Sequence, residues 1–402
     1  MHPDQSHLSL PFFDDVHRQL GKEVARWAAA TAPQIDETDD RAACRAWVKA
    51  LGDAGFLRWC VPSAYGGALD ELDSRALVVL RETLAFFSPL ADFAFAMQGL
   101  GSGAITLAGT VEQQHCYLRA VATGSKIAAF ALSEPGAGSD AGALSSRATR
   151  TESGWVLNGE KTWISNGGIA DFYCVFAKTD PDAGTRGISA FIVNASATGL
   201  DDSRHIPVMA PHPLATVTLR DCVVSEAALL GPLHGGFKLA MQTLDIFRAS
   251  VAGAALGFAR RALAEATQHA QQRRMFGHTL ADFQLTQAKL GQMAADVDSG
   301  ALLTYRAAWL RDDAVRRGSN ARVTAEPAMA KMTATENAQR VIDAALQMHG
   351  GLGVMVGGKV ESLYRDIRSL RIYEGATEVQ QLIIGKHVLA TSAAVLANTR
   401  GQ

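Results

Sequence analysis

The stretch Phe130-Ala131-Leu132-Ser133-Glu134-Pro135-Gly136-Ala137-Gly138-Ser139-Asp140 lies in a part of the chain that differs in composition from its flanks. It follows a run that is typical of a strand, and its glycines and small residues expose backbone N–H groups. Such a loop can lie flat against a planar, anionic ligand. Taken alone, the stretch is more typical of an ordinary Gly/Pro turn, because loops of this kind are common.

The region around this stretch, from about residue 123 to 232, is typical of a small β domain. Asn158-Gly159 stands between two apolar runs, and this dipeptide predicts a hairpin with a two-residue turn, because glycine and asparagine accept positive φ angles. Further strand-like runs, rich in β-branched and aromatic residues, lie at 172–177, 188–193 and 217–219.

The flanking parts, residues 1–122 and 233–402, are typical of helices. In the first part, residues 43–51 and 74–87 are rich in Ala, Leu, Arg and Glu. In the second part, apolar residues recur at spacings of three and four, which indicates one face of a helix. These faces are Leu244, Phe247, Val251, Ala255 and Phe258, and then Leu290, Met293, Val297 and Ala301.

A third helix is predicted from about Thr324 to Gly350-Gly351, with Pro327 tolerated in its first turn. The order of helices, β domain and helices predicts a mainly α protein with a central β domain. It favours one intimate assembly over independent modules.

The bulk composition excludes several classes of function. The 402 residues carry a net charge of −2, which does not suggest a surface for nucleic acid or anionic membranes. We find no apolar run of the roughly 18 residues that a membrane span requires, and no secretory signal. The five cysteines form no CxxC pair and no histidine cluster has metal spacing, so we expect free thiols, no metal and a cytoplasmic location.

Two further segments could bind a ligand. Trp163 and Ser165 occupy alternating positions of a strand, which would place an aromatic ring and a hydroxyl on one face. Arg273 and Phe276 stand three apart at a predicted helix end, where they could hold a pyrophosphate and an adenine. A core tryptophan beside a turn and a solvated basic helix end explain the same residues.

Glu374 lies between Tyr373 and Gly375, in a stretch that continues with Ala376-Thr377-Glu378. An aromatic and a glycine beside a carboxylate are compatible with a partly buried acid in a ligand cavity. Taken alone, a glutamate is far more often a solvated surface charge.

Together and in this order, these segments resemble the acyl-CoA dehydrogenase family. The likeness covers nearly the whole chain. It includes Val61-Pro62 with Tyr65-Gly66-Gly67, Leu244-Asp245 with Arg248, and Gln347-Met348-His349-Gly350-Gly351. The resemblance implies an N-terminal helical domain at 1–122, a middle β-barrel domain at 123–232 and a C-terminal four-helix bundle at 233–402.

The resemblance also implies non-covalent FAD and assigns roles to particular residues. Glu374 matches the catalytic base, and Phe247 stands where some members carry the base instead, so Glu374 has no visible rival. Substrate-binding positions are matched by Ser139, Asp245, Arg248 and Gly375. Positions that contact FAD, some of them across a subunit interface, are matched by Phe130, Leu132, Ser133, Trp163, Ser165, Arg273, Phe276, Gln284, Gln347, Gly351, Ala376 and Glu378.

The reaction implied is α,β-dehydrogenation of an acyl-CoA, with the α-proton removed by Glu374 and a hydride passed to flavin N5. The resemblance further implies a homotetramer, built as a pair of dimers, and an electron-transfer flavoprotein as acceptor. The bulk of Phe247 and Tyr373 favours short, branched or cyclic acyl groups. Alternatives are a flavin oxidase or eliminase, a dehydrogenase acting on carrier-protein thioesters, and a non-catalytic flavoprotein. Oxygen consumption with a substrate and no acceptor would indicate an oxidase. A panel of acyl-CoAs that never bleaches the flavin would indicate a non-catalytic flavoprotein.

Overall fold

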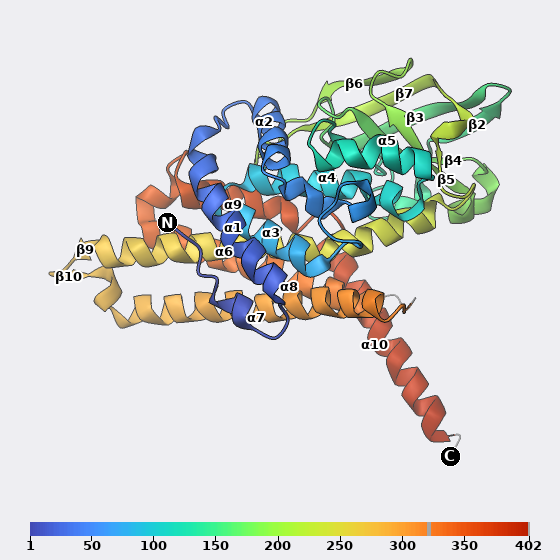
Figure 1. Ribbon diagram of the computed structural model, residues 1–402. Helices are drawn as coiled ribbons and strands as arrows, with labels where there is room; N and C mark the ends of the chain where they lie inside the picture. The colour runs from blue at the N-terminus through green and yellow to red at the C-terminus, as the bar shows by residue number, and fades with distance from the viewer. Residues whose placement is uncertain (320–322, 401–402) are drawn as a thin grey trace. The chain divides into compact units, whose positions relative to one another are not determined.

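The computed structural model describes residues 1–319 and 323–400, and contacts divide the chain into two compact units. The sheet unit contains Ala30–Asp73 and Leu90–Phe247, and the helical unit contains Met1–Ala29, Ser74–Pro89 and Arg248–Gln402. The predicted fold class, mainly helical with a central β domain, is confirmed (Figure 1). The boundaries of the three predicted domains stay a prediction, because the contacts group the chain into two units made of separate segments and not into three consecutive ones.

The sheet unit is built on strands that pair in the order β6-β7-β3-β2-β4-β5-β8, with β1 added in parallel to β4. The three runs predicted at 172–177, 188–193 and 217–219 are confirmed within β4, β5 and β7. The strands are β1 Ala128–Ala131, β2 Arg147–Thr151, β3 Gly154–Ser165, β4 Phe172–Lys178, β5 Ile188–Asn194, β6 Leu200–His205, β7 Leu214–Val224 and β8 Leu229–Leu230.

The hairpin predicted at Asn158-Gly159 is wrong, because β3 runs through this dipeptide without turning. The register of β3 against β7 shifts between Leu157 and Gly159, so the positive φ of Gly159, 151°, serves a bulge. A Cβ at Gly159 would lie 2.2 Å from Ser146 Oγ, so glycine is also needed for close approach. The tight turn of this region instead joins β2 to β3, where Thr151 pairs with Gly154.

Helices cover the sheet in the same unit. They include α2 Asp40–Asp53, α4 Pro89–Ala108 and α5 Val111–Ala122. Helix α4 approaches β1 closely, because a Cβ at Gly101 would lie 2.7 Å from the Ala128 backbone. The side chain of Gln98 accepts a hydrogen bond from Ala128 N at 2.8 Å and donates one to Lys126 O at 2.8 Å. The start of β1, and therefore of the loop that follows it, is fixed by α4.

The helical unit contains the predicted helices of the third part, together with two helices from the N-terminal region. Helix α7 packs against α8 and α6, since a Cβ at Gly300 would contact Ala334 and Leu256. The predicted faces are buried at Val251, Ala255 and Phe258, and at Met293, Val297 and Ala301. The helices are α1 Asp15–Thr31, α3 Ser74–Phe87, α6 Gly236–Gln272, α7 Gln284–Arg316, α8 Ala325–His349, α9 Lys359–Leu370 and α10 Thr377–Arg400. Residues 236–247 of α6 and 30–31 of α1 are grouped with the sheet unit.

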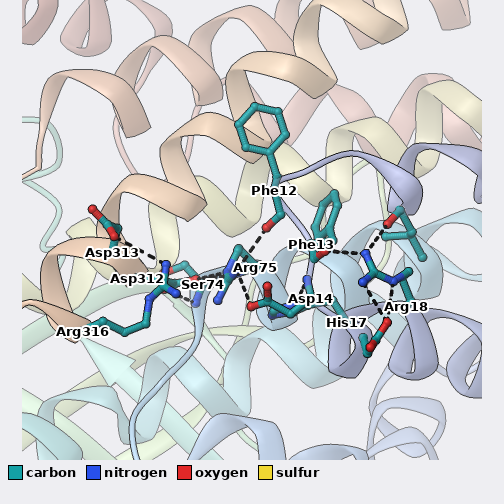
Figure 2. A network of polar contacts seen from close by, with 12 residues as sticks. Phe12, Phe13, Asp14, His17, Arg18, Ser74, Arg75, Asp312, Asp313 and Arg316 are labelled. Carbon is teal, nitrogen blue, oxygen red and sulfur yellow. Dashed lines mark hydrogen bonds and ion pairs between the residues drawn. The ribbon is translucent and has the colours of Figure 1, made fainter.

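A buried polar network joins three distant segments of the helical unit (Figure 2). The Arg75 guanidinium donates to Asp312 Oδ2 at 3.0 Å, to Asp14 Oδ2 at 2.9 Å and to Phe12 O at 3.1 Å. Asp312 also accepts from the backbone N–H of Ser74 at 2.7 Å. The network thus connects the chain start, α3 and α7.

Within the described residues, we find no helix whose length and apolar character would let it cross a membrane.

Candidate functional site

The loop that follows β1 is held against β3 by a buried ion pair. Lys161, in β3, donates to Glu134 Oε1 at 2.7 Å and to Leu132 O at 3.2 Å. Glu134 also accepts from the backbone N–H of Ser145 and Ser146, at 2.5 and 3.0 Å. Both partners of the pair are buried, so the loop has one well-defined position on the sheet.

The charges of this pair modify each other. Burial lowers the pKa of Lys161 to about 8, although the charge of Glu134 opposes this shift. Burial also raises the pKa of Glu134, but the Lys161 charge and the hydrogen bonds outweigh it and bring this pKa down to about 2. At neutral pH the pair is therefore ionic.

Trp163 lies next to this loop with its indole ring open to a ligand. Its side chain is 59% exposed and its φ is +59°, in a second irregularity of β3 between Lys161 and Ile164. The backbone N–H of Thr162 donates to Ser133 O at 3.0 Å, so β3 and the loop are linked directly beside the indole. Ser133 and Ser165 are half-buried. An exposed aromatic face suits a planar ring system.

In the helical unit, Glu374 lies in the short turn between α9 and α10. Its φ is +52°, and that of Gly375 is +94°. Left-handed backbone at a non-glycine residue costs roughly 1–3 kcal/mol and persists only where neighbouring groups hold it. Glu374 is half-buried. Among the described residues, Trp163 and Phe276 are also non-glycine residues with positive φ, so strain falls on three of the predicted site residues.

Several side chains hold this turn from α8 and α10. Lys331 Nζ and Gln380 Nε2 each donate to Gly375 O at 2.8 Å. On its other side, Glu336 Oε1 accepts from Arg371 Nε at 2.9 Å and from Thr377 Oγ1 at 2.7 Å. The turn is therefore fixed at its centre and at both ends.

A hollow of about 430 Å³ lies behind this turn. Its lining includes Glu336, Arg371 and Thr377, together with Met332, Thr333, Asn337, Arg340 and Gln381. The hollow thus shares its polar residues with the contacts that fix the turn.

The predicted FAD residues of this unit lie in two places. Ala376 is half-buried in the Glu374 turn and Glu378 is exposed in the first turn of α10, whereas the others lie at the hairpin end of the unit. The predicted helix end is found at Arg273, because α6 stops at Gln272 and the Arg273 N–H still donates to His269 O at 2.8 Å. Phe276 lies beyond the helix, in the hairpin of β9, Arg274–Met275, and β10, His278–Thr279. The Phe276 ring is 84% exposed. Arg273, Gln284, Gln347 and Gly351 are exposed as well.

Stacked rings of His269 and His349, with centroids 4.3 Å apart, bring the end of α8 to the end of α6. Lys331 is 18 positions earlier on α8, about 27 Å away at 1.5 Å per residue. Lys331, which contacts the Glu374 turn, is therefore far from this hairpin end. The interface role of the residues at the hairpin end stays a prediction.

The residues predicted to bind substrate differ in how far they are exposed to solvent. Ser139 is exposed on the loop after β1, Asp245 is half-buried on α6, and Arg248 is buried at 6% exposure in the helical unit. Phe247 is buried against two glycines of α4, because a Cβ at Gly99 or Gly103 would lie 2.6 or 2.8 Å from its ring. Phe130 packs against Phe176, and Leu132 is buried.

Sequence reasoning gave no role to Lys161, Glu134, Lys331, Gln380 or Glu336. A signal for Lys331 existed, because it shares a spacing of three and four with the buried residues Ala328, Ala334, Thr335 and Ala338 of α8. A lysine on a buried helical face requires a partner. The pairing of Lys161 with Glu134 left no such signal, because the two residues are 27 positions apart.

Three family models match successive parts of the chain. They are the acyl-CoA dehydrogenase N-terminal domain at residues 14–125, the middle domain at 129–222 and the C-terminal domain at 234–389.

Curated relatives and solved structures agree with these models. A 3-(aryl)acrylate reductase of Clostridium sporogenes is 38% identical over 94% of this chain and 100% of its own length. The caffeyl-CoA reductase-Etf complex subunit CarC of Acetobacterium woodii is 38% identical over 83% of this chain and 87% of its own. The structure of butyryl-CoA dehydrogenase from Megasphaera elsdenii superimposes with a TM-score of 0.86 at 32% identity, covering 94% of this chain and 99% of that one.

The described residues suit the cofactor of this family. The exposed indole of Trp163 and the exposed ring of Phe276 each offer a flat surface, and the ion pair below Ser133 keeps the loop beside the indole in place. This chain belongs to the acyl-CoA dehydrogenase family and is a flavin-dependent oxidoreductase whose cofactor is FAD.

Proposed function

We propose that this enzyme removes two hydrogens from an acyl-CoA thioester, with Glu374 as the base. The α-hydrogen leaves as a proton to the Glu374 carboxylate, and bound FAD supplies the acceptor for the β-hydrogen as a hydride. The backbone N–H of Glu374 is the proposed donor to the thioester carbonyl, where a positioned donor contributes a few kcal/mol. Trp163, Ser133 and Ser165 would hold the flavin ring.

The observation that carries this proposal is the construction of the Glu374 turn. A half-buried carboxylate is held in strained backbone, and the carbonyl of the next residue accepts from both Lys331 and Gln380. Strained and tightly held carboxylates occur at catalytic sites, where a fixed direction of proton transfer is worth the cost.

The test is Glu374→Gln in the FAD-loaded protein. We expect the variant to bind FAD and thioester but to lose flavin bleaching by substrate, by about 10²–10⁴-fold. The measurement is flavin absorbance after rapid mixing with acyl-CoA. Glu361→Gln is the control, since that carboxylate is bound to Arg365 on α9 and should keep the parental rate. Bleaching of Glu374→Gln at the parental rate would remove the base assignment.

Reduction of an α,β-unsaturated thioester is a second candidate, because two relatives at 38% identity are named as reductases of aryl-acrylate or caffeyl substrates. The same residues serve both directions by microscopic reversibility. Mixing the oxidised enzyme with butyryl-CoA or 3-phenylpropanoyl-CoA, and the reduced enzyme with the corresponding enoyl-CoAs, decides direction and substrate. Faster turnover of the aryl pair in the reductive direction would favour the second candidate.

For the acyl group, we propose a short, branched or cyclic chain. The Phe247 ring fills the space above Gly99 and Gly103, which leaves less room for a long chain beside α4. Phe247→Leu should therefore raise the flavin reduction rate with octanoyl-CoA relative to butyryl-CoA. An unchanged ratio would show that another element limits chain length.

For partners, we propose a homotetramer, an electron-transfer flavoprotein as acceptor, and a cytoplasmic location. The aromatic and aliphatic side chains of Phe276 and Leu285 are 84% and 86% exposed, as expected of residues that a second subunit covers. Light scattering gives the subunit number. Reoxidation of the reduced enzyme by an electron-transfer flavoprotein, compared with oxygen, identifies the acceptor and separates the dehydrogenase from an oxidase.

A further inference from the structure

A lysine is buried directly beside the turn that carries Glu374. Lys331 is fully buried on α8, among alanine and threonine side chains. Burying an ammonium group costs several kcal/mol unless its charge and hydrogen bonds are matched. A methionine would fill nearly the same volume without this cost, so the lysine requires an explanation in its contacts.

The first contact is the carbonyl of Gly375. Lys331 Nζ and Gln380 Nε2 both donate to this oxygen at 2.8 Å, and the Gln380 amide also lies 3.4 Å from Glu374 O. These donors fix the peptide that follows Glu374, and with it the left-handed backbone of that residue. A Cβ at Gly375 would lie 2.3 Å from Gln380 Nε2, so the glycine, too, is part of this arrangement.

The second contribution is electrostatic, from charged groups near the Lys331 ammonium. Among the charged groups that act on Lys331, Glu374 has the largest effect, followed by Arg248, Glu336 and Arg371. Glu336 is also paired with Arg371 at 2.9 Å, and Arg248 is a cation, so Glu374 is the anion with the strongest electrostatic effect on the ammonium. Burial lowers the pKa of Lys331 to about 8, opposed first by the charge of Glu374. The ammonium is still charged at neutral pH.

We propose that Lys331 is a positioning residue for the base: its ammonium holds the Gly375 carbonyl and presents a positive charge to the Glu374 carboxylate. The inference rests on the proposed function, because it takes Glu374 as the base. The charge stabilises the ionised carboxylate that accepts the α-proton, and the hydrogen bond keeps that carboxylate in one direction.

The test compares Lys331→Met with Gln380→Met in the FAD-loaded protein. Both variants remove one donor to the same carbonyl, but only the first removes a charge. The rate of flavin reduction by saturating butyryl-CoA is measured from pH 5 to pH 8. We expect both variants to reduce flavin at least about tenfold more slowly, since misdirected reacting groups lose rate steeply. Only Lys331→Met should move the midpoint of the pH profile upward, by at least about half a unit, because Glu374 loses a nearby cation.

Hydrogen exchange across residues 371–377 provides a readout that does not depend on turnover. We expect faster exchange in both variants. The thermal unfolding midpoint of Lys331→Met should fall, because the variant loses a hydrogen bond to Gly375 O and a buried charge near Glu374. The inference is overturned if Lys331→Met reduces its flavin at the parental rate with the parental pH midpoint. It is also overturned if amide hydrogen exchange across residues 371–377 is unaltered in this variant. A lower unfolding midpoint with no shift of the pH profile, which indicates a purely structural lysine, overturns it as well.

The two proposals fail in different ways. If Glu374→Gln is inactive while Lys331→Met behaves like the parent, only the positioning role is lost. If Glu374→Gln bleaches its flavin at the parental rate, the base assignment fails and the positioning role fails with it.

Discussion

The ion pair of Lys161 and Glu134 holds the loop that follows β1 against β3. The pKa of Glu134 is lowered to about 2 in the folded protein, where its ordinary value is 4.5, since the Lys161 charge and backbone donors outweigh burial. A carboxyl group with a lowered pKa stabilises the fold above the unfolded value, and this contribution is lost as the pH falls from about 4.5 toward 2.

From this we predict that Glu134→Gln lowers the free energy of unfolding by about 3 kcal/mol at pH 7. The difference from the parent should shrink as the pH falls below 4.5, because the parental carboxyl group then becomes neutral as well. Urea unfolding at pH 7 and pH 3.5, followed by circular dichroism, measures both values.

Glu160→Gln is the matched control, because Glu160 lies in β3 at the position before Lys161. Glu160 bridges Arg204 at 3.0 Å, but the two side chains are 35% and 62% exposed, so the loss should stay below about 1 kcal/mol. Equal losses in the two variants, or a loss for Glu134→Gln that does not depend on pH, would contradict the assignment.

Single residues also mark the limit of what the sequence can predict about the site. The motif around Glu374 and the aromatic at Trp163 could be recognised from their neighbours in the chain. Lys331 contacts Gly375, which is 44 positions away, and Lys161 contacts Glu134, which is 27 positions away. Such pairs depend on the folded chain, so no local pattern could assign them.

Strand β3 shows that contacts between distant residues also limit the prediction of a whole element. The apolar pattern of this stretch predicts a strand, as the structure has it, but Asn158-Gly159 also predicts a turn, because positive φ is typical of tight hairpins. In the folded sheet, Ser146 lies against Gly159, and β7 continues pairing on both sides of the dipeptide. Tertiary contact therefore decided between a bulge and a turn.

We predict that Gly159→Ala destabilises the sheet unit by roughly 2–4 kcal/mol. Its added Cβ would lie 2.2 Å from Ser146 Oγ, and its φ of 151° is one that alanine avoids. The measurement is the shift of the urea midpoint. The control is Gly291→Ala in α7, where a Cβ meets nothing within 4 Å, so the stability should stay equal or rise by up to about 1 kcal/mol. A midpoint for Gly159→Ala equal to the parental one would argue against the bulge.

At the scale of the whole molecule, segments that are far apart in the sequence belong to the same compact unit. The sequence correctly indicated helices, a β region and helices again, and it favoured one intimate assembly. It could not indicate that Met1–Ala29 and Ser74–Pro89 belong with the C-terminal helices. Arg75 contacts Phe12 and Asp312, which are 63 and 237 positions away, and periodicity contains no information on such contacts.

The last prediction concerns the cooperativity of this grouping. Asp312 is 4% exposed and accepts from Arg75 and from the backbone of Ser74 (Figure 2). Asp312→Asn removes the charge from the centre of a buried pair, which costs about 3–5 kcal/mol. If residues 1–29, 74–89 and 248–400 unfold together, amide hydrogen exchange should quicken in α1, α3 and α7 at once, and the strands β3 and β7 should exchange as in the parent.

Asp313→Asn is the control, because it alters the next residue of the same helix (Figure 2). Asp313 bridges Arg317 at 2.9 Å, but the Arg317 side chain is 73% exposed, so this pair contributes less than about 1 kcal/mol. Faster exchange confined to α7 in Asp312→Asn would mean that the three segments do not unfold as one. Equal acceleration in β3 and β7 would mean that the two units share a single transition, because losing one carboxylate in the helical unit would then release the sheet as well.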